Sequence, residues 1–121
     1  MNYDDNNIFA KILKEEIPCK KIYEDDFVLS FYDINPQKKI HALVIPKGKY
    51  IDLDDFNTNA SNDEIVGLMK GITIVSKNLG ISSIDGKGYR ALANVSDYGG
   101  QEVPHLHFHL FGGEKVGKMV S

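Results

Sequence analysis

Residues 103–113, near the end of the chain, read VPHLHFHLFGG. Three of the four histidines of the protein stand here at every second position, and an apolar residue fills each gap. Because successive side chains of a β-strand point to opposite faces of the sheet, a strand over residues 104–111 separates the imidazoles from the apolar side chains. We expect the apolar face to pack into the core and the histidine face to be exposed or to line a cleft. The imidazoles belong to His105, His107 and His109, and the apolar side chains to Leu106, Phe108 and Leu110.

Ordinary packing and metal binding are two interpretations of this pattern. A lone histidine on a strand is usually a satisfied polar residue, but three in alternate register argue against chance. His-rich tracts also bind zinc or copper. The outer two histidines of such a strand start ~13 Å apart, whereas each zinc–nitrogen bond is ~2.0 Å long, so all three cannot reach one ion without distorting the strand. The sequence has no cysteine or carboxylate cluster beside the tract to supply further ligands.

The third interpretation is nucleophilic and acid–base chemistry at a phosphorus centre. A neutral imidazole, whose ordinary pKa is ~6.5, attacks phosphorus without first losing a proton. Water then breaks the phosphorus–nitrogen bond, so one hard displacement becomes two easier ones, and a neighbouring histidine binds phosphate oxygens or passes a proton. Gly99, Gly100 and Gln101 directly precede the strand, and their backbone N–H groups can face phosphate oxygens.

Hydrophobic spacing predicts the N-terminal elements. Apolar residues at helical spacing indicate a short helix over about residues 8–15. KKIYED and FVLSFYDI are expected to form a hairpin. IHALVIP is apolar on both faces, which is typical of a central strand covered on two sides.

The second half of the chain contains the clearest helix. A polar stretch, DLDDFNTNASND, leads into SNDEIVGLMKGITIVSKNLG, where Ser61 and Glu64 can form a capping box and Gly80 can end the helix. GYRALANV reads as another strand. Runs of strands joined by short turns predict an α+β fold with a largely antiparallel sheet, and one long and one short helix packed against it.

Length and composition favour a single cytoplasmic domain over residues 1–121, with a polar extension at 1–7 and a tail at 112–121. The net charge of −3 argues against nucleic acid as a partner. Cys19 is the only cysteine, so no internal disulfide forms. The polar N-terminus and the lack of any apolar run near the ~18 residues of a membrane span predict neither a secretory signal nor a membrane anchor.

HLHFHLF matches the signature of the histidine triad (HIT) superfamily, and residues 8–47 and 88–113 resemble the two halves of its histidine triad nucleotide-binding protein branch. The resemblance implies a homodimer in which two five-stranded antiparallel sheets adjoin across the two-fold axis. It also implies hydrolysis of purine nucleoside phosphoramidates, such as adenosine phosphoramidate and lysyl-adenylate, to nucleoside monophosphate and amine. No metal or other cofactor is implied, and the expected partner besides a second copy is an AMP-like purine nucleotide.

The resemblance also implies a role for each histidine. The middle histidine of the triad, His107, would be the nucleophile. His109 would contact the phosphate near the leaving group, and His105 and His41 would orient the site. Asp33 would bind the ribose, because a carboxylate accepts from two adjacent O–H groups.

Hydrophobic and loop residues would complete the nucleotide site. Ile12 and Phe31 can equally be core residues, and Asp33 can also begin the turn of the DINP segment. The residues implied to enclose the base are Ile8, Phe9, Ile12, Phe31 and Ile34, and those implied to lie along the phosphate are Asn94, Gly100 and Gln101.

Two residues depart from the family pattern. Glu102, counted here with the nucleotide-binding residues, stands where the family often has Ser or Thr near the departing group. Pro104 resembles the dinucleoside polyphosphate hydrolase branch, whereas the GG after the triad and the N-terminal block favour the phosphoramidase branch. We therefore predict a nucleoside phosphoramidate hydrolase that forms a nucleotidyl-His107 intermediate. A diadenosine polyphosphate hydrolase and a nucleotide-sensing interaction module with incidental catalysis are the alternatives.

Overall fold

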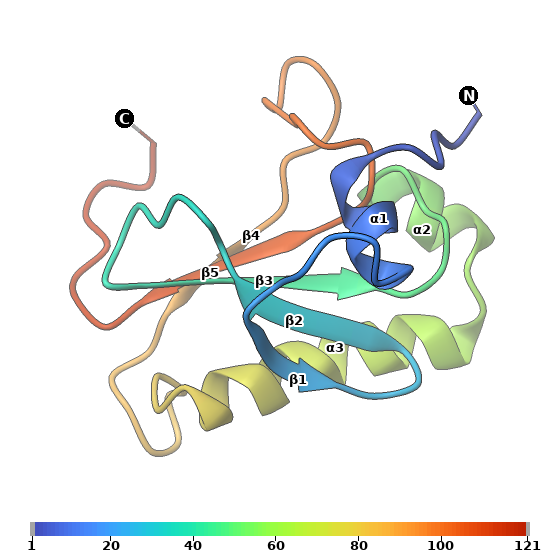
Figure 1. Ribbon diagram of the computed structural model, residues 1–121. Coiled ribbons are helices and arrows are strands. Elements are labelled where there is room, and N and C mark those ends of the chain that lie inside the picture. The colour runs from blue at the N-terminus through green and yellow to red at the C-terminus, as the bar shows by residue number, and fades with distance from the viewer. Residues whose placement is uncertain (1, 121) are drawn as a thin grey trace.

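The computed structural model of the protein describes residues 2–120 (Figure 1). Over this range the chain forms three helices and one five-stranded antiparallel sheet, which confirms the predicted fold class. In the same range, no helix is both long enough and apolar enough to cross a bilayer. The helices are α1 (Ile8–Leu13), α2 (Leu53–Asn59) and α3 (Asn62–Asn78), and the strands are β1 (Lys21–Glu24), β2 (Val28–Tyr32), β3 (Ile40–Pro46), β4 (Arg90–Leu92) and β5 (Phe108–Gly112).

Strand β3 is the centre of the sheet, whose strand order is β1-β2-β3-β5-β4. All of its residues except the first are buried, so the prediction that IHALVIP forms a central strand is confirmed. On β5, Phe111 lies opposite His41 and His109 lies opposite Leu43. This register brings His41 and His109 close together on neighbouring strands.

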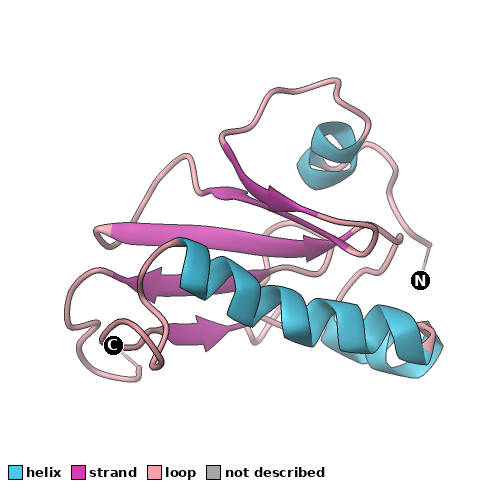
Figure 2. Ribbon diagram, turned by 90° about the horizontal axis from the view of Figure 1, so that it is seen from below, coloured by secondary structure: helices cyan, strands magenta, loops and turns pink. Residues whose placement is uncertain are grey.

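Alternate residues of β3 face two separate hydrophobic clusters. Ala42 and Val44 belong to the cluster beneath α3, whereas Leu43 and Ile45 belong to the cluster that α1 covers. Figure 2 shows α3 running along one face of the sheet. Phe9 of α1 contacts the ring of His107, so the triad lies on the α1 side.

The long helix α3 begins and ends where its sequence predicts. The side chain of Ser61 accepts a hydrogen bond from the backbone N–H of Glu64, and the Glu64 carboxylate accepts one from the backbone N–H of Ser61. This reciprocal pair is the predicted capping box. Beyond the helix, Gly80 has a φ of +73°, a left-handed conformation that favours glycine and stops the helix.

The last strand is shorter than predicted. It begins at Phe108 instead of residue 104, because the preceding backbone is bonded elsewhere. The N–H of Leu106 donates to the carbonyl of Tyr50, and Pro104 has no N–H to offer a strand ladder. His105 and His107 therefore precede the sheet, although the predicted alternation of their side chains with the apolar ones persists: Leu106, Phe108 and Leu110 all pack in the α3 cluster.

Two other bounds differ from the prediction, and one helix is not predicted. Helix α1 ends at Leu13, and β4 contains three of the eight residues of GYRALANV. Helix α2 forms within the polar stretch DLDDFNTNASND. The Asp52 side chain caps it by accepting from the N–H of Asp55, and Phe56 anchors it in the core with 1% of its surface exposed.

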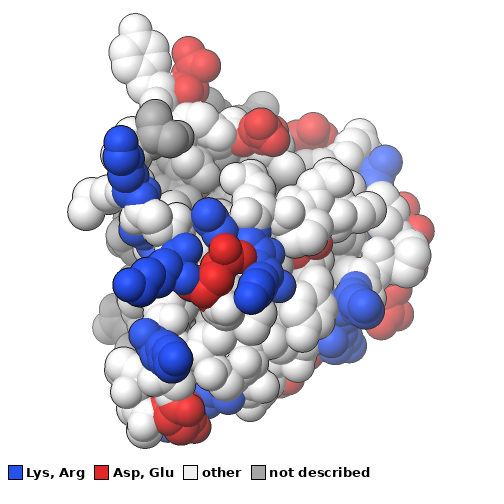
Figure 3. All heavy atoms as spheres, turned by 90° about the vertical axis from the view of Figure 1, so that its left-hand side faces the viewer, with Lys and Arg blue, Asp and Glu red and all other residues white. Residues whose placement is uncertain are grey.

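The C-terminal tail folds back onto the same chain. Glu114 accepts a hydrogen bond of 2.7 Å from the backbone N–H of Lys39, and the guanidinium of Arg90 donates to the carbonyls of Gly117 and Lys118. Figure 3 shows this side of the molecule, where basic side chains surround an acidic one.

Candidate active site

All four histidines gather between α1, β3 and β5. The ring centroid of His107 lies 5.0 Å from that of His109, which in turn lies 5.2 Å from that of His41. His105 is separated from this group because its ring packs toward the N-terminal segment, 5.7 Å from the ring of Tyr3. Three imidazoles thus form a row, and the fourth lies behind the nucleophile proposed from the sequence.

The hydrogen bonds of His107 determine which of its nitrogens carries the proton. Its Nδ1 lies 2.8 Å from the carbonyl oxygen of His105. Because a carbonyl only accepts, Nδ1 must be the protonated nitrogen. Burial lowers the pKa of His107 below its ordinary value of 6.5, although the carbonyl of His105 partly opposes the shift. The ring is therefore neutral near pH 7, and its Nε2 holds a free electron pair.

His107 is less open than the sequence predicts. Only 6% of its surface is exposed. Across residues 2–120, every buried side-chain nitrogen or oxygen has a hydrogen-bond partner, and no described residue bonds to Nε2 of His107. Nε2 of His107 is therefore not a fully buried atom.

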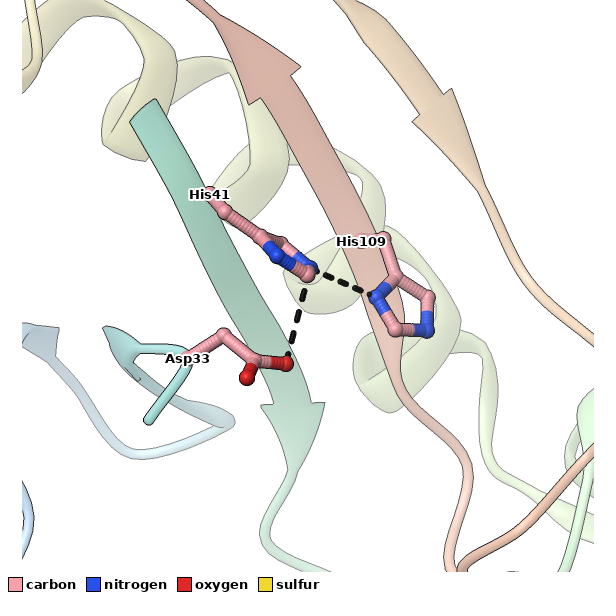
Figure 4. Close-up of side chains that lie close together, drawn as sticks. All are labelled: Asp33, His41 and His109. Carbon is pink, nitrogen blue, oxygen red and sulfur yellow. Dashed lines mark hydrogen bonds and ion pairs between the residues drawn. The ribbon is translucent and has the colours of Figure 1, made fainter. Parts of the chain in front are cut away.

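His41 and His109 form a second ordered pair (Figure 4). The backbone N–H of Gln37 donates to Nδ1 of His41 over 3.2 Å, so the proton of a neutral His41 is on Nε2. That Nε2 lies 2.9 Å from Nδ1 of His109 and 3.5 Å from a carboxylate oxygen of Asp33. A neutral His109 that accepts at Nδ1 carries its own proton on Nε2.

The pKa values of this pair agree with neutral rings. Burial, followed by the charges of His107 and His41, lowers the pKa of His109 to about 4. Burial also lowers the pKa of His41, against the opposing charge of Asp33. At neutral pH the site thus offers one unprotonated nitrogen, Nε2 of His107, and one N–H donor, Nε2 of His109.

Asp33 serves both the turn and the cleft. One carboxylate oxygen accepts from the backbone N–H of Asn35 over 2.8 Å, as in a DINP turn. The other oxygen lies near His41, as Figure 4 shows. Asp33 also lines the cleft beside His41, so the turn and the predicted ribose contact are compatible.

A cleft of about 1070 Å³, large enough for a nucleotide, reaches the site at His41. The predicted site residues His105, His107 and His109 do not line this cleft. Ile12 and Phe31 are both core residues and part of its wall, with 8% and 4% of their surfaces exposed. Ile34 is 89% exposed at the rim. The predicted site residues that line the cleft are Ile8, Phe9, Ile12, Phe31, Asp33, Ile34, His41 and Glu102.

The predicted phosphate loop does not line this cleft. Asn94 donates to the carbonyl of Gly99 over 2.6 Å, and the amide of Gln101 donates to the carbonyls of Ile51 and Val103. These side chains hold the loop in shape, and Gly100 takes a φ of +77° within it. Contact of this loop with a phosphate stays a prediction.

Several cleft residues carry no signal in the sequence pattern. Pro18, Cys19 and Lys20 line the wall after α1, and Lys39 and Val103 also contribute. Only their positions in the sequence associate them with the site: three follow the predicted helix over residues 8–15, Lys39 lies two residues before His41, and Val103 lies two residues before the triad. Burial raises the pKa of the Cys19 thiol, which disfavours its reactive thiolate form.

Asp33, His41 and His109 form the one group in residues 2–120 whose potential metal-ligand atoms lie within 4.8 Å of one another. Its hydrogen bonds oppose metal binding, because Nε2 of His41 carries the proton that it donates to His109. A cation at this point would have to displace that proton and break the contact between the two rings.

Comparison with known proteins places these features in a family context. A family model described as the HIT domain matches residues 14–116. An uncharacterized HIT-like protein of Azospirillum brasilense is 49% identical over 119 residues, covering 98% of this chain and 95% of that protein. The purine nucleoside phosphoramidase of Escherichia coli is 38% identical over 117 residues, covering 97% and 95%. The structure of a HIT family hydrolase from Clostridium thermocellum superimposes with a TM-score of 0.85 at 36% identity, covering 98% and 99%.

Proposed function

Because this chain belongs to the HIT family, with hydrolases among its relatives, we propose that it hydrolyses purine nucleoside phosphoramidates to nucleoside monophosphate and amine. The observation that carries the proposal is the hydrogen bond from Nδ1 of His107 to the carbonyl of His105. It leaves Nε2 of a neutral imidazole as a nucleophile.

The proposed reaction has two displacements. Nε2 of His107 attacks phosphorus, and the bond from phosphorus to the amine nitrogen breaks while that nitrogen takes a proton from the solvent. The N–H of His109 Nε2 donates to a phosphate oxygen and offsets the charge that develops there. In the second step water attacks phosphorus and loses a proton, which releases the nucleoside monophosphate and regenerates neutral His107.

The cleft supports recognition of a nucleoside. Ile8 and Ile34 expose apolar surface at its mouth, with 46% and 89% of their surfaces accessible, and Phe9 continues this wall toward His107. We propose that the base lies among these three side chains. The carboxylate oxygen of Asp33 that faces His41 would accept from a ribose hydroxyl.

We also propose that the protein is a homodimer whose sheets adjoin at β4. This strand is at the edge of the sheet, and among residues 2–120 no strand pairs with its outer side. Sedimentation velocity would detect a dimer, and a monomer at all concentrations would contradict the proposal. The cytoplasmic location and the absence of a nucleic-acid partner stay predictions.

Intact-protein mass analysis during turnover of adenosine phosphoramidate tests the reaction. After a quench in denaturant at alkaline pH, where a phosphorus–nitrogen bond survives, wild-type protein should carry a nucleotidyl adduct, and His107→Ala should not. His41→Gln is the matched control, because it removes an imidazole from the same site but leaves the nucleophile, so the adduct should still form. An adduct that persists in His107→Ala would show that another group attacks phosphorus.

Pro104 supports one competing function, a diadenosine polyphosphate hydrolase. Turnover of adenosine phosphoramidate and of a diadenosine polyphosphate, compared at equal enzyme concentration, separates the two. Failure of the wild-type protein to hydrolyse any adenosine phosphoramidate would refute our proposal.

A further inference from the structure

The ring of His105 is fully buried and hydrogen-bonded at both nitrogens. Its Nε2 lies 2.9 Å from the carbonyl oxygen of Pro46, so this nitrogen carries the proton. Its Nδ1 lies 2.5 Å from the hydroxyl oxygen of Tyr3. A neutral His105 must therefore accept at Nδ1, and the hydroxyl of Tyr3 is the donor.

The backbone around His105 has few other attachments. The ladder between β3 and β5 begins only at Phe108, so the preceding residues lack strand partners. Leu106 is held by one bond from its N–H to the carbonyl of Tyr50. The carbonyl that orients His107 belongs to His105 itself, so the placement of the His105 ring bears directly on the nucleophile.

Tyr3 belongs to a segment that is itself anchored. The carboxylate of Asp5 lies 2.8 Å from the ammonium of Lys49, and the ammonium of Lys14 donates to the carbonyl of Asp5 over 3.1 Å. Residues 1–7, expected to be a polar extension, thus include a residue that bonds to the triad across 102 positions of sequence.

We propose that Tyr3 is a positioning residue for His107. Its hydroxyl holds the ring of His105, and the main chain of His105 then fixes the carbonyl that keeps the proton of His107 on Nδ1 and the electron pair on Nε2. The expected effect of Tyr3 on kcat rests on the proposed function, whereas the protonation of the His105 and His107 rings does not depend on it.

Tyr3→Phe tests the role of the hydroxyl, because it keeps the aromatic ring and removes only the donor. We expect kcat for adenosine phosphoramidate to fall about tenfold with KM within about twofold, since a small displacement of a reacting group lowers rate more than binding. We also expect the ¹⁵N resonances of His105 and His107 to shift.

Asp5→Asn is the matched control. It removes the ion pair that anchors the same segment to Lys49 but leaves the hydroxyl of Tyr3 in place. Its kcat and its histidine ¹⁵N resonances should match those of the wild type. Equal losses of kcat in both variants would overturn the proposal, because they would assign the effect to the segment and not to the hydroxyl.

The ¹⁵N spectrum of the wild-type histidines gives a test that needs neither activity nor a folded variant. His105 should be protonated at Nε2 alone and His107 at Nδ1 alone, with Nδ1 of His105 shifted by a hydrogen bond. A proton on Nδ1 of His105 would refute the proposal. Correct tautomers in a protein that hydrolyses no phosphoramidate would refute the proposed function only.

Discussion

The buried ring of His105 should make the stability of the protein depend on pH. Its pKa is lowered to about 4: burial is the largest cause, the bond to the carbonyl of Pro46 opposes the shift, and the charge of the nearby His107 adds to it. In the unfolded chain the same ring titrates near ~6.5. Between these two values the unfolded chain binds a proton that the folded protein does not, so the free energy of unfolding falls as the pH falls.

The size of this effect follows from the two pKa values. For a single group that titrates near 6.5 when unfolded and near about 4 when folded, linkage gives a loss of about 2 kcal/mol between about pH 7.5 and pH 5. That loss is a large share of the stability of a small domain, which is roughly 5–15 kcal/mol. Carboxylates add their own pH dependence, so the contribution of His105 must be measured as a difference.

Urea unfolding of wild-type protein and of His105→Gln, at equal protein concentration and at several pH values, measures that difference. The glutamine amide can donate to the carbonyl of Pro46 but has no proton to gain in this range. The variant should be less stable than the wild type at pH ~7.5, and the gap should narrow by about 2 kcal/mol at pH ~5. Parallel pH profiles of the two proteins would refute the assignment of a buried, neutral His105.

Three further results are expected. In Asp33→Asn, the KM for adenosine phosphoramidate should rise about tenfold in steady-state kinetics, since an amide is a weaker acceptor than a carboxylate. The variant should also lose the preference of the wild type for this substrate over its 2′-deoxy analogue. An unchanged preference would show that Asp33 does not bind the ribose. In the pH profile of kcat/KM, the midpoint of the acid limb should lie below pH 6.5, because burial lowers the pKa of His107 and protonation removes its nucleophilic electron pair. A midpoint at or above pH 6.5 would contradict a desolvated nucleophile. Ser61→Ala should lower the free energy of unfolding by about 1 kcal/mol in urea titrations without affecting kcat, and no loss of stability would show that the capping box of α3 is dispensable.

Much of the fold is readable from local pattern because local interactions determine it. Helix α3 combines a long apolar stripe with a capping box and a terminating glycine. Helix α2 has only two large apolar residues, Leu53 and Phe56, in seven positions, so it lacks a stripe that distinguishes it from a polar loop. The sequence predicts too early a start for β5, because His and apolar side chains already alternate in residues 104–107, where the backbone does not yet pair with β3.

The chemistry of the triad is readable only in part. Alternation alone separates the histidines from Leu106 and Leu110, and resemblance alone singles out His107. The protonation of His105 depends on Tyr3 and Pro46, which are distant in sequence. The protonation of His41 and of His107 depends on nearby backbone groups, the N–H of Gln37 and the carbonyl of His105, that only the folded loops bring into contact. The spacing of residue types along the sequence does not predict such contacts. The burial that lowers the pKa of every histidine likewise arises from tertiary packing.

The strand order β1-β2-β3-β5-β4 has a consequence for synthesis on the ribosome. Strand β4 emerges before β5, yet its partner in the sheet is β5, which must insert between β3 and β4. A nascent chain that stops short of β5 therefore leaves the buried edge of β3 open to other chains, a known hazard for aggregation. The same insertion places His107, the proposed nucleophile, so the protein completes its sheet and its candidate site in one late event.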